Sequence, residues 1–122
     1  MEPEKIKQFD TEPEVFPSAP LTALFESFKA EYKTRFLKKY QDQDDVCFYK
    51  NAENQEHYAK CLLSLEKSFE ESKRYAGFKI NFVHKKIKEC INSKLYRRNH
   101  KEGEAYCTNQ ANQYVKQILD SV

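Results

Sequence analysis

The residues with the most evident chemistry are four cysteines, Cys47, Cys61, Cys90 and Cys107. Thiols can pair as disulfides, bind zinc or act as nucleophiles. An even number of cysteines at mirrored positions favours a disulfide framework in an oxidising compartment, with four reduced thiols as the alternative. Zinc is disfavoured, because the one His–Cys pair at helical spacing, His57 and Cys61, has no Cys-x-x-Cys knuckle beside it.

The pairing of these cysteines depends on where the chain turns. Gly77 is one of only two glycines, and a glycine can end a helix in the left-handed conformation. If Gly77 is the tip of a helical hairpin, Cys47 meets Cys107 and Cys61 meets Cys90, and we favour these nested bridges. The alternative pairs Cys47 with Cys61 and Cys90 with Cys107. It requires the chain to double back within each pair, because a continuous helix holds those cysteines roughly 20 Å apart.

Other catalytic chemistry has little support in this sequence. His57, His84 and His100 have no acid or nucleophile partner at a motif spacing, and two glycines cannot build a phosphate-binding loop. Nothing near the cysteines indicates a thiol of low pKa. We therefore expect no enzymatic activity, no cofactor and no metal site in this chain.

The composition limits the elements that position these residues. The chain has 122 residues, which corresponds to one domain, and 33% of them are charged. With 39% hydrophobic residues, scarce Gly and Pro and no long β-type alternation, helices with one apolar face are favoured. The predicted fold is all-α: a disulfide-braced antiparallel helical hairpin with an additional N-terminal amphipathic helix and an extended N-terminal arm. The arm is expected over residues 1–19 and the helical domain over residues 20–122.

The N-terminal arm contains three prolines and scattered apolar residues, so we expect it to lie extended along a partner surface. A disordered tail is the alternative. Ser18 as N-cap and Pro20 in the first turn predict a helix start. No apolar run reaches the ~20 residues that cross a bilayer, so no transmembrane helix is expected. The first residues show neither a secretory signal nor a mitochondrial presequence.

The predicted first helix carries an apolar stripe at spacings of three and four residues. Core packing is the favoured interpretation, and a docking face for a protein or membrane is the alternative. The candidate docking residues, including two from the arm, are Phe9, Phe16, Leu21, Phe25, Phe28, Tyr32 and Phe36. The acidic stretch 41–45 is expected to end this helix and cap the next one. Further breaks are expected at residues 50–56 and 101–106.

Basic residues dominate the exposed side of the segment after Gly77. Such a run could contact RNA or anionic lipid head groups. The whole chain nevertheless has 21 basic and 19 acidic residues, so a solvated or protein-paired face is favoured and nucleic acid is disfavoured as a partner. The candidate residues for contact with an anionic surface are Lys85, Lys86, Lys88, Arg97 and Arg98.

The segment from Cys61 onward resembles a known family. The elements concerned are Cys61, residues 79–90 (KINFVHKKIKEC), and residues 101–106 (KEGEAY) leading into Cys107 and a final amphipathic helix. This pattern resembles the PDSW accessory subunits of respiratory complex I, the NADH:ubiquinone oxidoreductase, over roughly the last two thirds of the chain. The wider coiled-coil-helix class has twin Cys-x9-Cys pairs, whereas 13 and 16 residues separate the cysteines here.

The resemblance implies a non-catalytic structural accessory subunit on the intermembrane-space side of the mitochondrial inner membrane. Members of the family are oxidised by the disulfide relay and clamp neighbouring subunits of this large membrane-embedded respiratory complex. Peripheral contact with anionic lipid fits the basic residues. The alternatives are another coiled-coil-helix subunit or assembly factor of a respiratory complex, and an RNA-contacting helical protein of the mitochondrial ribosome.

Overall fold

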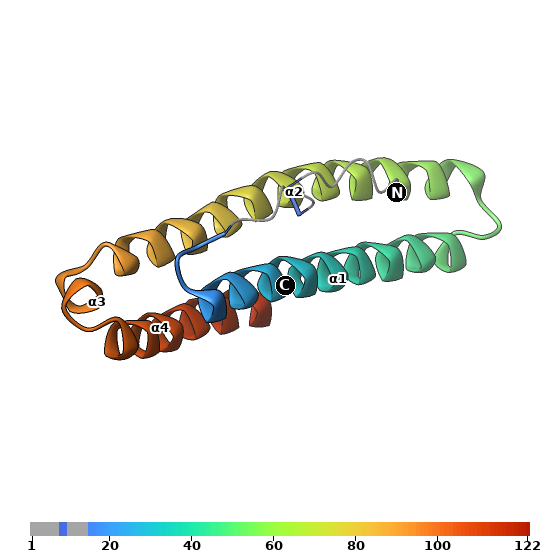
Figure 1. Cartoon of the computed structure of the whole chain (residues 1–122). Coiled ribbons are helices and arrows are strands. Elements are labelled where there is room, and N and C mark those ends of the chain that lie inside the picture. Colours follow the sequence, from blue (N-terminus) through green and yellow to red (C-terminus); the bar gives the residue numbers. More distant parts are fainter. Residues whose placement is uncertain (1–7, 10–14) are drawn as a thin grey trace.

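The structure, a computed structural model, describes residues 8–9 and 15–122. It contains four helices: α1 (Ala19–Lys50), α2 (Gln55–Ile91), α3 (Lys94–Arg98) and α4 (His100–Asp120). These described residues include no strand, and the predicted all-α class is confirmed. Helices α1 and α2 run antiparallel, and α4 lies beside the first half of α1 (Figure 1).

Helix α4 runs parallel to α1, and two hydrogen bonds between the helices show this direction. Near the start of both helices, the Ser18 hydroxyl donates a 2.8 Å hydrogen bond to Glu104. Further along, Arg35 donates a 2.9 Å bond to the Leu119 carbonyl. Three helices therefore pack together over this half of the molecule, and α1 and α2 continue beyond it as a pair.

Helix α1 begins as predicted and ends later than predicted. Ser18 is its N-cap, with the hydroxyl accepting from the Leu21 N–H, and Pro20 lies in the first turn. The expected end at residues 41–45 is wrong, because the helix continues to Lys50. A preference of acids for a helix N-terminus contributes only about 0.3–1 kcal/mol. Burial of Tyr40 and Cys47 on either side of the acidic stretch outweighs it.

The predicted hairpin tip at Gly77 is also wrong. Gly77 lies inside α2, which continues for 37 residues, and neither glycine has a positive φ angle. A glycine inside a helix costs only about 0.5–1 kcal/mol relative to alanine. Burial of the neighbouring Ala76 and Ile80 offsets that cost. The chain instead reverses at residues 51–54 and again between α2 and α4.

The expected break at residues 101–106 lies within α4. That helix starts at His100, with the Asn99 side chain accepting from the Glu102 N–H at 3.2 Å. Gly103 is buried where α3 crosses α4, and a Cβ there would overlap the Cα of Tyr96. The second glycine therefore permits a close approach of two helices and does not end one.

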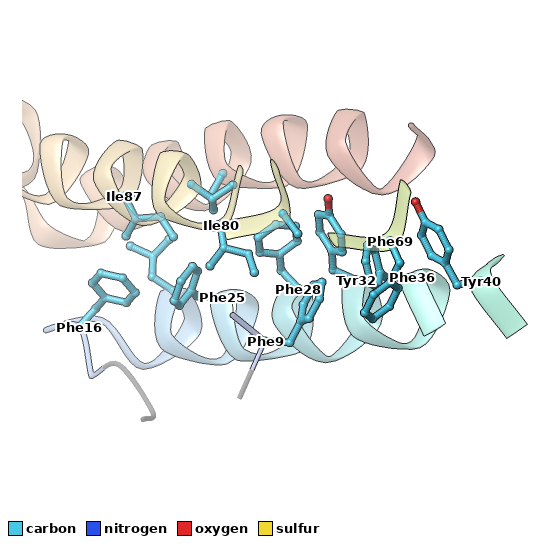
Figure 2. Packing of buried hydrophobic residues seen from close by; sticks show 14 of the residues in the cluster. Phe9, Phe16, Phe25, Phe28, Tyr32, Phe36, Tyr40, Phe69, Ile80 and Ile87 are labelled. Carbon is cyan, nitrogen blue, oxygen red and sulfur yellow. The ribbon is translucent and has the colours of Figure 1, made fainter. Parts of the chain in front are cut away.

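The core is a row of aromatic side chains from α1 that faces α2 (Figure 2). The Phe36 and Tyr40 rings lie 5.3 Å and 5.2 Å from the Phe69 ring of α2. From the N-terminal segment, Phe9 packs 5.0 Å from Tyr32. Between residues 41 and 64, by contrast, Cys47 is the only buried residue.

Candidate functional site

Two disulfides brace the two reversals of the chain. Cys47–Cys61 joins α1 to α2 across residues 51–54, and Cys90–Cys107 joins α2 to α4 past α3. The Cα atoms are 5.7 Å apart in each bridge, and no cysteine is free.

The favoured nested pairing is therefore wrong, and the alternative pairing is the one that forms. Cys61 and Cys90 lie on the same helix, about 43 Å apart along its axis at the α-helical rise, far beyond disulfide reach. The nested pairing required a turn at Gly77 that the chain does not make. The doubling back that the alternative requires occurs at both reversals.

The candidate docking residues of the first helix and arm lie in the core. All seven, from Phe9 to Phe36, have exposed fractions of 5% or less. The chain itself covers them, so the core interpretation holds and they offer no docking face. Phe9 and Phe16 belong to the arm and contact this chain's own α1 rings. The arm was expected to lie along a partner, but these two apolar residues pack on this chain itself. Residues 1–7 and 10–14 of the arm lie outside the described residues, and the expectation stays a prediction there.

The candidate anionic-surface residues divide into two groups. Lys86 is half-buried, lies 3.6 Å from Glu89, and has its ammonium over the rings of Phe82 and Tyr114. The other four are exposed at the end of α2 and on α3: Lys85, Lys88, Arg97 and Arg98. Lys86 is thus part of the packing between α2 and α4, and the other four face solvent.

The His57–Cys61 pair, which the sequence disfavoured as a zinc site, cannot offer a thiolate, because the Cys61 sulfur is bonded to Cys47. Across residues 8–9 and 15–122, no group of three or more His, Cys, Asp or Glu side chains is arranged to hold a metal ion.

A hollow that the sequence did not reveal lies at the point where α4 ends. It has a volume of about 530 Å³ and lies between α1 and α2. We call it the aromatic cleft. Its apolar wall consists of Tyr32, Phe36 and Tyr40 from α1 together with Tyr75 and Phe78 from α2. Figure 1 shows α4 ending partway along α1. Ser121 and Val122, which follow α4, line the edge of the cleft.

Hydrogen bonds and burial fix the deep wall of the aromatic cleft. The Tyr40 hydroxyl donates to the Ser72 hydroxyl at 2.6 Å and lies 3.2 Å from the Ser68 carbonyl oxygen. Burial raises the pKa of Tyr32 above its ordinary value of 10.0, and the neighbouring Tyr40 raises it further. The Tyr32 phenol is therefore neutral at physiological pH.

Three cations surround the aromatic cleft: Lys39, Arg74 and Lys79. Lys39 lies 5.7 Å from the centre of the Tyr40 ring, and Lys79 lies 5.8 Å from that of Tyr75. Within the described part of the chain, none of the three forms an ion pair. Glu71 is the one acidic side chain in the lining. The cleft therefore combines an apolar floor with an excess of positive charge.

A second hollow continues from the aromatic cleft between α2 and α4. This aromatic groove has a volume of about 270 Å³ and shares Tyr75, Phe78 and Lys79 with the cleft. Phe82 and Tyr114 form its far end, with ring centres 5.4 Å apart. The α2 rings remain accessible, since Tyr75 is 66% and Phe78 69% exposed. Tyr75, Phe78 and Phe82 are spaced by three and four residues, a pattern that indicates one face of a helix. The hairpin tip predicted at Gly77 obscured this signal.

A separate apolar patch lies beside the first reversal. Val46, Phe48 and Tyr49 are all at least half exposed, and the Phe48 ring contacts Tyr58 of α2 at 5.7 Å. We call these three residues the turn patch.

None of the helices in the described part of the chain has an apolar stretch long enough to span a membrane. No family model, curated protein or solved structure matches the chain.

Proposed function

We propose that this chain is a non-catalytic structural accessory subunit of mitochondrial NADH:ubiquinone oxidoreductase. It would lie on the intermembrane-space side of the inner membrane and stabilise the assembly by clamping neighbouring subunits. One observation carries the proposal: disulfides close both reversals of a helical rod whose surface still exposes large aromatic side chains.

The disulfides support an oxidising location. Such bridges persist in oxidising compartments and are rare where thiols are kept reduced. Each bridge closes a short loop, with sequence separations of 14 and 17 residues. In the chain-entropy model each stabilises the fold by about 3 kcal/mol. That contribution would keep the thin rod folded before it reaches its neighbours.

The exposed aromatic residues support a clamp with two contact points. The turn patch contacts α2 at Tyr58, and Leu95 and Tyr106 are exposed beyond the other end of α2, about 50 Å away along that helix. Exposed aromatic clusters mark interaction surfaces, and aromatic residues are enriched in interface cores. A rigid helix with exposed apolar side chains beyond each end can hold two neighbours at a fixed separation.

The sequence resemblance supplies the identity of the complex in this proposal. It rests on Cys61, residues 79–90 and the residues that lead into Cys107. Each bridge spans one reversal of the chain, so the pair differs from the nested bridges of a coiled-coil-helix hairpin. The proposal therefore depends on the oxidised cysteines and exposed rings and not on that architecture.

Native complexome profiling of mitochondria from the source cells tests the proposal. The chain should migrate with the NADH dehydrogenase assembly, and its deletion should lower the amount of that assembly. A Tyr49→Ser variant, which truncates the turn patch, should reduce co-migration. Leu63→Ser is the matched control, because Leu63 is a comparably exposed residue of α2 outside both patches. Migration only as a monomer, or residence in a reducing compartment, would refute the proposal.

An RNA-contacting protein is the second candidate, because Lys85, Lys88, Arg97 and Arg98 face solvent. Filter binding against a salt series separates the two. Sub-micromolar affinity for RNA that falls steeply with salt and is lost on charge reversal of Lys85 and Lys88 would favour RNA. Indifference to RNA favours the clamp.

A further inference from the structure

We infer that the aromatic cleft and the adjoining aromatic groove bind the anion of a long-chain fatty acid. The carboxylate would lie among Lys39, Arg74 and Lys79, and the alkyl chain would follow the rings of Tyr75 and Phe78 along α2. This site goes beyond the proposed function and does not depend on it.

The positive charge around the cleft identifies the head group of the ligand. Lys39 and Lys79 lie over the rings of Tyr40 and Tyr75, and neither these lysines nor Arg74 forms an ion pair among the residues described. Hydrogen bonds from such cations to a carboxylate are about twice as strong as neutral ones. The lining has one acidic side chain, Glu71, against these three basic ones, so its side chains carry a net charge of +2 and favour an anionic head group.

The shape of the joined hollows identifies the tail. The volume of about 530 Å³ lies within the range of small-molecule sites, and the cleft adjoins the smaller groove, whose lining includes Phe82 and Tyr114. Tyr75, Phe78 and Phe82 lie on one face of α2 and extend about 10 Å along its axis. An elongated apolar chain with one charged end fits this arrangement of cations and rings.

A partner helix that continued the path of α4 is a poorer fit. Beyond the cleft, toward the first reversal, α2 presents Ser64 and Ser68, and α1 presents Gln43, all exposed. The surface that such a helix would cover beyond the cleft is therefore polar. The apolar area is limited to the size of a small amphiphile.

Isothermal titration of the oxidised full-length chain with dodecanoate, below its micelle concentration, tests this inference. We expect saturable one-to-one binding with a Kd of about 10–100 µM. Dodecanol, which has the same chain without the charge, should bind at least about tenfold more weakly. Hexanoate, which keeps the charge and loses half the chain, should bind more weakly by a similar factor or more.

Paired variants locate the site. The double variant Arg74→Gln, Lys79→Gln should weaken dodecanoate binding by about tenfold or more. Its control, Lys85→Gln with Lys88→Gln, removes the same charge from α2 outside the cleft and should leave the Kd unchanged. Phe78→Ser should weaken binding severalfold, while Leu63→Ser should not. All of these side chains are wholly or partly exposed, so the variants should keep the circular dichroism spectrum of the parent chain.

Three results would overturn the inference. The first is an absence of saturable binding up to about 1 mM dodecanoate. The second is equal binding of dodecanoate and dodecanol, or equal weakening by the site variants and their controls. The third comes from the native assembly: a photo-crosslinker placed at residue 78 that captures a protein and no lipid would show that a partner occupies the groove.

Discussion

The chain reverses at both ends of the molecule, and a disulfide braces each reversal, but the two ends differ in packing. At the end that contains α3 and α4, three helices meet, with Tyr96, Cys107 and Ala111 buried. At the other end, residues 41–64 of α1 and α2 form a two-helix end in which only Cys47 is buried. The three-helix end has a disulfide in addition to a core. The two-helix end has a disulfide in place of one.

The comparison shows how a chain with few apolar residues can hold long helices. A pair of helices buries too little surface to offset the entropy of ordering its backbone. A bridge across the turn removes freedom from the unfolded chain without requiring any buried area. This arrangement leaves the outer residues of the two-helix end, including the turn patch, available for contacts with other molecules.

The largest effect is expected at the three-helix end, from Gly103→Ala. The new Cβ would overlap the Tyr96 backbone, so α3 would have to move off α4, at a cost of about 3 kcal/mol or more. Urea unfolding measures this loss. Gly77→Ala is the control, because its Cβ would meet only the flexible Gln8 side chain, at 3.2 Å, while helix propensity improves. Equal stability changes for the two variants would contradict the close packing of α3 on α4.

The next largest effect is expected from removing one disulfide at a time. Replacing either cysteine pair with alanine should lower the free energy of unfolding by about 3 kcal/mol, because the closed loops are similar in length. Hydrogen exchange should differ more than global stability does. Without Cys47–Cys61, the amides of residues 41–64 should lose protection while the rest stays protected. Without Cys90–Cys107, packing of Tyr96 against Gly103 should preserve partial protection of α4. A uniform loss of amide protection in both variants would contradict the difference in packing between the two ends.

A smaller effect compares helix caps at the two ends. Ser18→Ala removes the cap of α1 and the buried hydroxyl that bonds Glu104 of α4, so we expect a loss of about 1–2 kcal/mol. Asn54→Ala removes the exposed cap of α2, with an expected loss of about 0.5–1 kcal/mol. Thermal unfolding of the two variants measures the difference. A larger loss for Asn54→Ala would reverse the ranking of the two ends.

The smallest effect is the pH dependence of stability due to Tyr32, a buried residue of α1 between the two ends. Its pKa is raised in the folded state, so the folded chain retains a proton that the unfolded chain releases above about pH 10. The stability due to this group is present below pH 10 and is lost as the pH rises through the folded pKa. Melting temperatures between pH 9 and pH 11 should fall less steeply for Tyr32→Phe than for the parent chain. Tyr49→Phe, which removes the hydroxyl of a well-exposed tyrosine, is the matched control.

The sequence predicted the parts of the fold that depend on local signals. Ser18 and Pro20 define the start of α1 correctly, and the apolar stripe from Leu21 to Phe36 is the buried face. The predicted interruption at residues 50–56 contains the first reversal. These features follow from capping chemistry and helical periodicity, which involve residues close together in the chain.

The features that the sequence did not predict depend on tertiary packing. The spacing of Gly77 and Gly103 is compatible with helix ends, yet packing holds both in helices, against Gln8 and Tyr96 respectively. The wrong turn at Gly77 then led directly to the wrong disulfide pairing. The aromatic cleft exists because α4 ends partway along the pair formed by α1 and α2. No local pattern encodes the relative length of helices distant in the chain.

The connectivity of the bridges has a consequence for the order of events during folding. Each bridge spans one reversal, so either can close as soon as its own two helical segments touch, without waiting for the opposite end of the rod. Nested bridges would have required the whole hairpin to align first. Contacts of low sequence separation form fast, and a chain with one bridge closed should therefore be a productive intermediate and not a trap.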